Sequence, residues 1–309
     1  MTATLRPAES YADAVAFTDL RTLVTPYQVY TPERIHHIWQ VTPAHAYAQK
    51  LVAEVDGQIV AAGRASFNTW TSEEGVASLT VMVHPDHRRR GIGAQLHREL
   101  TDHLLGHGAR KIEAWGEDET DVPGFAERRG YERTFELRYS KLDLTDLAAL
   151  PPIPDVAPGV TAVAFSAVEP EAVFAVDAAS VVDEPGNSAA DALDYEEWRT
   201  GVWDSPSIDK EASTLVLVDG VPAAYTNVEV DRRTRRMWSN GTGVLREHRG
   251  KGLAKLAKAV AVRRAAERGV TAAYTSNDEV NKPMLAVNTW LGYQYAATQY
   301  SYLRTVNPA

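Results

Sequence analysis

A short basic segment in the second half of the chain has residue types and spacing suited to binding a phosphate. Its members are Arg249, Gly250, Lys251, Gly252, Leu253 and Ala254. It joins the apolar run Met237–Val244 to a stretch whose apolar residues recur at helical spacing. Glycines here let backbone N–H groups point into the space before the helix, where the helix dipole adds about half a positive charge. Such a turn favours a phosphate or pyrophosphate site.

The first half of the chain repeats this segment after the apolar run Val76–Val83. The repeated members are Arg88, Arg89, Arg90, Gly91, Ile92, Gly93 and Ala94. An offset of 161 residues aligns His87 with His248 and Gly91 with Gly252. A repeat of this length indicates two copies of one domain rather than a solenoid. One such loop alone could be an exposed turn without a ligand, but two in equivalent positions favour a binding function. Neither loop completes a Walker or dinucleotide motif.

The elements around the two loops predict an α+β fold with a mostly antiparallel sheet. Asp56-Gly57 and Asp219-Gly220 each separate two apolar runs, which is typical of a hairpin turn. Each half then has a further strand, the basic loop, a long helix, another strand, a short helix and a last strand. We therefore expect two tandem domains, each a mostly antiparallel mixed sheet flanked by helices.

The boundary between the domains is predicted at a proline-rich stretch. Pro151, Pro152, Pro154 and Pro158 disfavour helix and central strand and suit a stiff linker. The predicted division is residues 1–146, a linker at 147–159, and residues 160–309.

Composition excludes several functional classes. The 309 residues include 44% hydrophobic and 24% charged residues and no cysteine, which excludes disulfide scaffolds, iron–sulfur clusters and thiol nucleophiles. A formal charge of −9 disfavours broad nucleic-acid binding. No apolar run approaches the roughly 20 residues of a membrane span, and the start lacks a leader pattern, so a cytoplasmic location is expected. No spacing indicates a metal site.

The two loops resemble the acyl-coenzyme A pyrophosphate loop of the GNAT superfamily of N-acetyltransferases. That loop reads Arg-x-x-Gly-x-Gly/Ala between a strand and a long helix, and both segments fit it. The resemblance covers nearly the whole chain as a tandem pair. Tandem families of this build include mycothiol synthases and acetyltransferases of antibiotic biosynthesis or self-resistance.

The resemblance implies a cofactor, acetyl-coenzyme A, and a mode of binding it. The strand before the loop is expected to splay from its neighbour, so that its free backbone groups bind the pantetheine arm and polarise the thioester. This implicates Thr242 and Val244 in the second half and Val81, Met82 and Val83 in the first. The reaction implied is direct attack by a neutral amine, with a backbone N–H stabilising the oxyanion.

The C-terminal half is predicted to be the catalytic one. Asn277 and Asn281 resemble the asparagines with which family members contact the pantetheine arm, and residues 116–119 of the first half have none. Capping of a helix is the alternative role for Asn277. The N-terminal half would then bind the cofactor silently or act as a scaffold.

One departure from the family pattern concerns the proton donor. Many members have a tyrosine four residues before the glycine of the last motif, where this chain has Asn288. Asn288 could still contact the cofactor, and Tyr274 is our candidate acid, with Tyr293 and Tyr225 as alternatives. The strand Met237–Val244 carries no carboxylate, so Glu229 is our candidate base, acting through water, with Asp231 as a second candidate; both lie near the end of the preceding strand. A surface charge is the alternative role for both.

The substrate side is predicted in the irregular segments before the second hairpin. Asp183 and Glu184, with Tyr195 and Trp198, would suit a cationic amine through ion pairing and cation–π contact. The alternative is a solvated helix with buried aromatic residues.

The sequence thus predicts an acetyl-coenzyme A-dependent N-acetyltransferase for a small-molecule primary amine, possible as a homodimer. The alternatives are a tandem module that binds acyl-coenzyme A without transferring the acyl group, and a protein lysine acetyltransferase.

Overall fold

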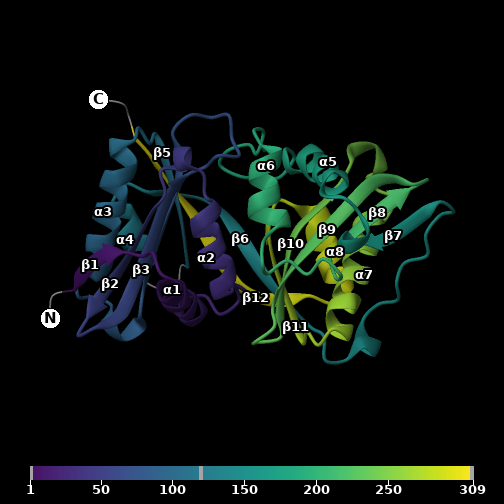
Figure 1. Cartoon of the computed structure of the whole chain (residues 1–309), viewed down its shortest axis with the longest axis horizontal. Helices are drawn as coiled ribbons and strands as arrows, with labels where there is room; N and C mark the ends of the chain where they lie inside the picture. The colour runs from purple at the N-terminus through teal and green to yellow at the C-terminus, as the bar shows by residue number, and fades with distance from the viewer. Residues whose placement is uncertain (1–2, 118–120, 307–309) are drawn as a thin grey trace. The chain divides into compact units, whose positions relative to one another are not determined.

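The chain forms two compact units in the computed structural model, which describes residues 3–117 and 121–306. The first unit comprises the residues up to Leu137, Gly186–Ala192 and the residues from Thr298 on. The second comprises Arg138–Pro185 and Leu193–Ala297. Figure 1 labels their helices and strands.

The strands are β1 (Thr4–Pro7), β2 (Gln49–Val55), β3 (Gln58–Phe67), β4 (Val76–Val83), β5 (Lys111–Gly116), β6 (Glu132–Asp143), β7 (Val160–Ala164), β8 (Thr214–Val218), β9 (Val221–Asp231), β10 (Arg236–Val244), β11 (Ala272–Asp278) and β12 (Gln294–Thr305). The helices are α1 (Tyr11–Val24), α2 (Pro32–Val41), α3 (Ile92–Gly106), α4 (Val122–Glu127), α5 (Pro170–Val181), α6 (Tyr195–Trp198), α7 (Leu253–Glu267) and α8 (Lys282–Leu291).

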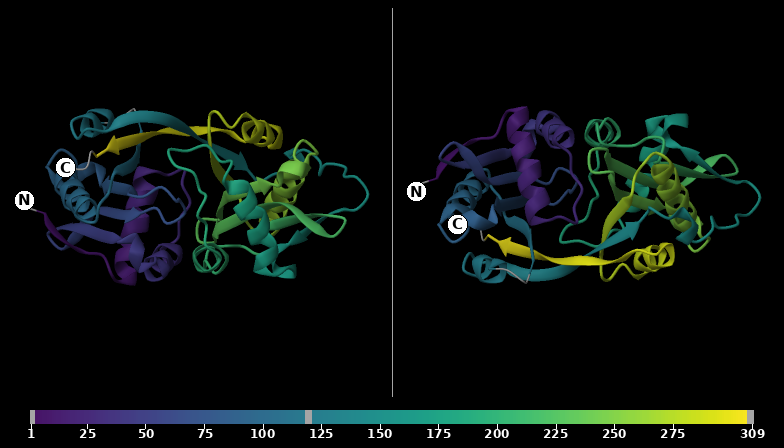
Figure 2. Two further views of the ribbon diagram at one scale, coloured as in Figure 1. Left: turned by 90° about the horizontal axis from the view of Figure 1, so that it is seen from above. Right: turned by 90° about the horizontal axis from the view of Figure 1, so that it is seen from below.

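The first unit has the strand order β1-β2-β3-β4-β5-β12-β6. Neighbours from β1 to β4 are antiparallel, β4 and β5 are parallel, and β12 runs antiparallel to β5. Alternate residues of the sheet point to opposite faces. Helices α3 and α1 lie on opposite faces of this sheet (Figure 2). Leu96 and Leu100 of α3 pack on one face, and Phe17 of α1 packs on the other.

The second unit repeats this plan with the order β7-β8-β9-β10-β11-β6-β12. The strands β7 to β10 are antiparallel, and β10 is parallel to β11. Helix α7 packs with Val228 and Met237 on one face of the sheet, whereas α5 packs with Tyr225 on the other. This α+β architecture confirms the predicted fold class.

The compact units are not continuous in sequence, which differs from the simple division at 1–146, 147–159 and 160–309. Strands β6 and β12 are long, and each contributes one part to each unit. The last part of β12, Tyr300–Thr305, pairs with β5 of the first unit. The proline-rich stretch belongs to the second unit, where the carbonyl of Pro151 accepts a hydrogen bond from Arg263. The predicted boundaries therefore remain a prediction of where the two copies of the repeat begin and end. They do not coincide with the limits of the compact units.

The two predicted hairpin turns are present. Asp56 and Gly57 connect β2 to β3 with φ of 51° and 78°, and Asp219 and Gly220 connect β8 to β9 with φ of 51° and 80°. Two consecutive positive φ values match the twist of the flanking strands, which explains why an Asp-Gly pair occupies both turns.

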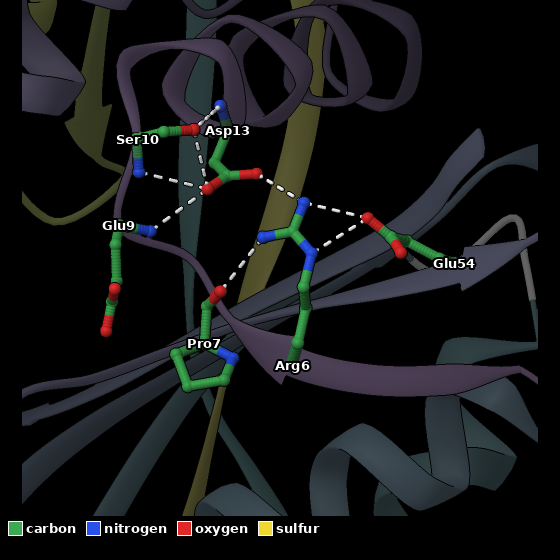
Figure 3. A network of polar contacts seen from close by, with 6 residues as sticks. All are labelled: Arg6, Pro7, Glu9, Ser10, Asp13 and Glu54. Carbon is green, nitrogen blue, oxygen red and sulfur yellow. Dashed lines mark hydrogen bonds and ion pairs between the residues drawn. The ribbon is translucent and has the colours of Figure 1, made fainter. Parts of the chain in front are cut away.

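A polar network fixes the junction between β1 and α1 (Figure 3). Ser10 and Asp13 form a capping box, in which the Asp13 N–H donates to Ser10 Oγ at 3.1 Å and the Ser10 N–H donates to Asp13 Oδ2 at 3.0 Å. Arg6 of β1 donates to Asp13 at 2.7 Å and to Glu54 of β2 at 2.8 Å. The hydrogen bond from Arg6 holds the pKa of Asp13 well below its usual range. The network ties the helix start to two strands.

Asp13→Ala should lower the free energy of unfolding by about 1–2 kcal/mol at pH 7, because it removes the carboxylate half of the capping box and the charge-assisted hydrogen bond from Arg6. A carboxyl group with a lowered pKa contributes stability above its unfolded pKa, so the loss should shrink as the pH falls below about 4. Urea unfolding at pH 7 and pH 3 measures both effects. Asp19→Ala, an exposed change on the same helix, serves as the control, and equal losses in the two variants would refute the assignment.

Candidate active site

The parallel strands β10 and β11 separate soon after they begin to pair. Their pairing covers only Arg236–Trp238 of β10 and Ala272–Tyr274 of β11. At the point of separation, the carbonyl of Ser239 accepts a hydrogen bond from Thr275 Oγ1 at 3.0 Å. In the first unit, β4 and β5 likewise pair only over Val76–Ser78 and Lys111–Glu113. Each unit therefore has a split between two strands, as the resemblance implied.

The backbone groups that face the split follow from the pairing on the other side of β10. The Leu245 N–H donates to the carbonyl of Ala223 at 2.9 Å. Because hydrogen-bonded and non-hydrogen-bonded pairs alternate in an antiparallel ladder, the N–H and C=O groups of Val244 and Thr242 point away from β9. They therefore face the split, as predicted for these two residues.

The same alternation applies to β4. The His84 N–H donates to the carbonyl of Val60 at 2.8 Å, which places the backbone groups of Val81 and Val83 toward the split. Met82 is paired with Ala62 of β3, and its side chain is buried. The backbone of Met82 thus faces β3 rather than the split, in contrast to its neighbours.

The loop before α7 leaves its amides open to a ligand. Gly250 and Gly252 have φ of 75° and 79°, and a Cβ atom at either position would meet no atom within 4 Å. No side chain caps α7, which begins at Leu253. Lys251 is exposed beside these glycines, and Ala254 lies in the first turn. The geometry suits an anion that accepts hydrogen bonds from free N–H groups at a helix start.

The loop before α3 is built in the same way with one difference. Gly91, with φ of 84°, begins the helix at Ile92 and also has open space around it, while Gly93 packs against Val83. Arg89, with φ of 61°, occupies the position equivalent to Gly250 and forms an ion pair with Asp121. A side chain in the left-handed region is uncommon, so this loop is the more strained of the two. Arg90 and Ala94 complete the segment.

An arginine fastens each loop to the end of the strand before it. Arg249 Nε donates to the carbonyl of Val244 at 3.0 Å, and Arg88 Nε donates to the carbonyl of Val83 at 3.2 Å. Arg249 also contacts Asp183, which forms a second ion pair with Arg246. These two guanidinium groups lower the pKa of Asp183 well below its usual range. The carboxylate predicted to bind a substrate amine is thus held by cations of the protein.

Strand β10 has a bulge that β4 lacks. The register between β9 and β10 shifts between Ser239 and Thr242. The Gly241 N–H donates to Asn227 Oδ1 at 2.7 Å, and Thr226 Oγ1 donates to the carbonyl of Gly241 at 3.3 Å. The pairing of β3 with β4, in contrast, is uninterrupted. Because a bulge re-aims the backbone beside it, the second unit alone has a reshaped strand at the split.

A buried carboxylate supports the bulge from the α5 face. Asp177 of α5 accepts hydrogen bonds from Tyr225 OH and Trp198 Nε1, each at 2.7 Å. Burial raises the pKa of Asp177 in spite of these bonds. The Tyr225 side chain lies against Gly241 and Gly243: a Cβ atom at Gly241 would be 2.6 Å from the Tyr225 hydroxyl, and one at Gly243 would be 2.7 Å from the ring and closer still to Ser180 Oγ. The glycines of β10 are therefore required by this close approach.

Two further carboxylates belong to this face of the second unit. Glu229 of β9 is 5% exposed and is paired with Trp238 of β10. The side chain of Glu184 is exposed, yet partial desolvation by the surrounding protein and the charge of Asp177 raise its pKa to about 7. The sequence analysis predicts Glu229 as the base and places Glu184 on the substrate side.

The three asparagines of the second unit have different roles. Asn281 caps α8, because its side chain accepts a hydrogen bond from the Met284 N–H at 3.3 Å. Asn288 Nδ2 donates to Asn277 Oδ1 at 2.5 Å. The helix cap considered for Asn277 is thus supplied by Asn281, whereas Asn277 and Asn288 form a pair beside the split. Residues 118–120 lie outside the described residues, so only Gly116 and Glu117 can be compared in the first unit.

The predicted aromatic residues are engaged in packing. Arg236 lies over the ring of Tyr274, with its Cζ atom 4.4 Å from the centroid. Trp198 is 1% exposed, so its ring cannot stack on a substrate. Tyr195 stacks on Trp198 and donates to Glu171 at 2.6 Å, which raises the pKa of Tyr195 to about 12.

In the first unit, a side chain from a distant segment binds β5 and β12 next to the point where β4 and β5 separate. Asn187 Nδ2 donates to Glu113 Oε1 at 2.6 Å and to Ser301 Oγ at 2.8 Å. Glu113 is the last residue of β5 that pairs with β4. The segment Gly186–Ala192 is held there by a second contact, from Ser72 to Asp191. No local pattern around Asn187 indicated this role, since its partners are distant in sequence.

Asn227 and Asp177 support β10 at the split, and the sequence analysis did not single them out. Asn227 lies in a strand that is buried almost throughout, and Asp177 lies on a buried face of α5. A polar residue inside an apolar run is a signal of a specific partner, because a buried polar group needs a hydrogen bond. That signal was available in the sequence.

The described residues contain neither a membrane-spanning helix nor a candidate metal site. Within residues 3–117 and 121–306, no helix combines the length and apolar character needed to cross a membrane. In the same ranges, no cluster of three or more His, Cys, Asp or Glu side chains is arranged to hold a metal ion.

Comparison with known proteins agrees with this architecture. The chain is 29% identical over 242 residues to the mycothiol acetyltransferase of a Nocardioides species, and the match covers 71% of this chain and 77% of that protein. A GCN5-related N-acetyltransferase from Sphaerobacter thermophilus has a TM-score of 0.75 at 17% identity, covering 99% of this chain and 96% of that one. A tandem GNAT protein from the clavulanic acid biosynthesis pathway has a TM-score of 0.74 at 22% identity, with both chains fully covered.

The model of the acetyltransferase (GNAT) family matches residues 15–135 and 181–293, one match in each half of the chain. These matches cover more than half of the sequence and include both glycine-containing loops. The chain therefore belongs to the GNAT family and is an acyl-coenzyme A-dependent N-acetyltransferase with two GNAT domains in tandem.

Proposed function

We propose that the protein transfers the acetyl group of acetyl-coenzyme A to a small-molecule primary amine, and that the second unit is the catalytic one. Acetylation of a small molecule agrees with the resemblance to mycothiol acetyltransferases. A protein lysine would be the alternative acceptor, and acetylation of a peptide panel but of no small amine would favour it.

One observation carries the choice of the second unit. Its split has a bulged strand with backbone groups of Thr242 and Val244 directed into it. In the first unit, β4 is regular, and Asn187 is bonded to the side chains of Glu113 on β5 and Ser301 on β12. Within the described residues, only the second unit therefore combines the split with a bulged strand.

The residues of the second unit fit the cofactor that the family uses. The open space before Gly250 and Gly252 suits the pyrophosphate, and the Thr242 and Val244 amides suit the pantetheine arm. Asn277 and Asn288 lie on β11 and α8, on the far side of the split. The cofactor supplies an activated acetyl group, and a backbone N–H of β10 would stabilise the oxyanion, a contribution of roughly 3–4 kcal/mol.

The substrate amine would approach from the α5 face. We propose Glu229 as the base that removes the amine proton through water, and Glu184 as the carboxylate that attracts the amine. Asp183 is not assigned to the substrate, because Arg246 and Arg249 hold it.

Gly252→Trp should abolish acetyl transfer, because the indole would fill the space that the pyrophosphate needs. We expect kcat/KM to fall at least about 100-fold, or about 2.7 kcal/mol. Gly91→Trp is the matched control, since Gly91 is the equivalent residue with the same left-handed φ and the same open space. It should leave kcat/KM within about threefold.

Titration calorimetry with acetyl-coenzyme A measures binding in the same variants. Loss of binding in Gly252→Trp with normal binding in Gly91→Trp is the expected result. Full activity of Gly252→Trp, or loss of activity only in Gly91→Trp, would assign catalysis to the first unit instead.

Asn227→Ala should slow acetyl transfer by relaxing the bulge of β10. The change leaves the half-buried Gly241 N–H without its acceptor, which costs about 1 kcal/mol, and we expect kcat to fall at least about tenfold. Ser66→Ala is the control, because Ser66 is a buried polar residue of β3, the first-unit strand that precedes β4 as β9 precedes β10. Steady-state kinetics and thermal unfolding separate the two effects, and unchanged kcat in Asn227→Ala would show that the bulge is not needed.

The KM for the amine should depend on pH through Glu184. A carboxyl group with a pKa of about 7 is neutral at pH 6 and charged at pH 8, so its attraction for a cationic amine grows over this range. We expect KM to fall several-fold from pH 6 to pH 8 in the wild-type enzyme and to change less in Glu184→Gln. Parallel profiles of the two enzymes would exclude this role.

A further inference from the structure

A lysine is buried in the core of the second unit without an acidic partner. Lys258 of α7 is 2% exposed, and its Nζ atom donates to Ser239 Oγ at 2.8 Å. Within the described part of the chain, no carboxylate lies at ion-pair distance from it. Burial lowers the pKa of Lys258 to about 7. An unpaired cation in an apolar interior is costly, so a function is the natural reason for keeping it.

The position of Lys258 relates it to the split. Ser239 follows Trp238, the last residue of β10 that pairs with β11, and its carbonyl is bonded to Thr275. Ser239 is paired with Val228, whose side chain packs on α7, so the Ser239 side chain is on the α7 face of the sheet. The lysine therefore reaches the closed end of the split from that face.

The two asparagines mark the same face. Ala273 packs with α7, so Thr275 and Asn277, two and four residues further along β11, point to that side as well. Asn288 of α8 contacts Asn277 there. Asn288 holds the position at which many relatives of this fold have a tyrosine, and an amide is not a useful proton donor. The ionisable groups left to act as an acid on this face are Lys258 and Tyr293, and burial raises the pKa of the tyrosine, which makes it the weaker acid.

The ionisable groups around Lys258 are few. Tyr293 faces it, with the Lys258 Nζ atom 5.6 Å from the ring centroid, and burial raises the pKa of that tyrosine. Strand β10 contributes Ser239, β11 contributes Thr275, and β9 contributes the apolar Val228. Desolvation alone accounts for the shift of the lysine pKa, with no charged neighbour.

We propose that Lys258 supplies the proton for the departing thiolate of coenzyme A, acting through the hydroxyl of Ser239. This inference rests on the proposed function of the second unit. As the carbon–sulfur bond breaks, the sulfur keeps the electron pair and takes the proton of the Ser239 hydroxyl. Lys258 gives a proton to Ser239 Oγ and becomes a neutral amine. After the product leaves, solvent returns a proton to Lys258, which balances the proton that the substrate nitrogen has lost. Lys258 is then a positioning residue, and Ser239 is the group that meets the sulfur.

The energetics suit this transfer. General acids work best when their pKa is close to the working pH, and a lysine near 7 is acidic enough to protonate a thiolate, whose conjugate acid has a pKa near 8.5. The first unit has His97 at the equivalent position, bonded to Tyr131 at 3.2 Å. Burial lowers the pKa of His97 to about 4, so the imidazole is neutral and has no proton of this kind to give.

Lys258→Met tests the proposal, with His97→Met as the matched control in the first unit. We expect kcat to fall about 100-fold in Lys258→Met, with the Kd for acetyl-coenzyme A by calorimetry within about threefold of the wild type. The fall of kcat in the wild type above pH 7 should be absent in Lys258→Met and in Ser239→Ala. His97→Met should keep both kcat and its pH profile.

Stability gives a readout that does not depend on activity. Because the unfolded lysine binds a proton more tightly than the buried one, wild-type stability should rise between pH 6 and pH 9 relative to Lys258→Met. The urea midpoint of Lys258→Met at pH 7 should be at or above that of the wild type. A kcat equal to the wild type in Lys258→Met, or a loss of kcat matched by lost stability and lost cofactor binding, would overturn the proposal. If Gly252→Trp were fully active, the proposed function would fail first, which distinguishes the two outcomes.

Discussion

The separation of β10 from β11 is the constraint on which the second unit depends. A parallel pair normally satisfies the backbone groups on both strands, and breaking that pair leaves N–H and C=O groups that need other partners. Here Thr275 closes the ladder at Ser239, Arg249 takes the carbonyl of Val244, and the amides of Thr242 and Val244 remain directed to the split. A ligand with its own amides, such as a pantetheine arm, is a suitable partner for such groups. The same separation therefore leaves backbone groups that need hydrogen-bond partners and forms the space in which a ligand can supply them.

The duplicated domains show how one plan can have two uses. Both units have the split, the left-handed glycine and the arginine that fastens the loop to the strand. They differ at the positions that touch the reacting atoms in our proposal. The second unit has a bulge supported by Asn227, whereas the first has Asn187 bonded to Glu113 at the separation point. Since the shared features concern phosphate binding and the different ones concern chemistry, the copies have kept the scaffold and diverged at the site.

Features set by neighbouring residues could be predicted from the sequence. The Asp-Gly turns, the two glycine loops and the helices after them follow from φ requirements and apolar spacing, and all are present. Features set by distant residues could not. The last part of β12 belongs to the first unit because it pairs with β5, which is distant in sequence. The ion pairs of Asp183 depend on Arg246, more than sixty residues away. The asparagine that caps α8 is Asn281 rather than Asn277. The two residues are four positions apart, and the sequence pattern alone does not decide which of them begins the helix.

Lys258 shows a third kind of limit. Its neighbours Leu253, Leu256 and Ala257 define an apolar stripe, and a lysine beside such a stripe is normally read as an exposed side chain that extends to solvent. Only the packing of α7 on the sheet shows that the ammonium group is enclosed. The arrangement also separates opposite charges: Glu229 is on the α5 face of the sheet and Lys258 is on the α7 face, with β10 between them. If the two groups shared one face, they would form an ion pair, which would lower the pKa of the carboxylate and raise that of the lysine. In our proposal, their positions on opposite faces of β10 keep a base and an acid available in the same turnover.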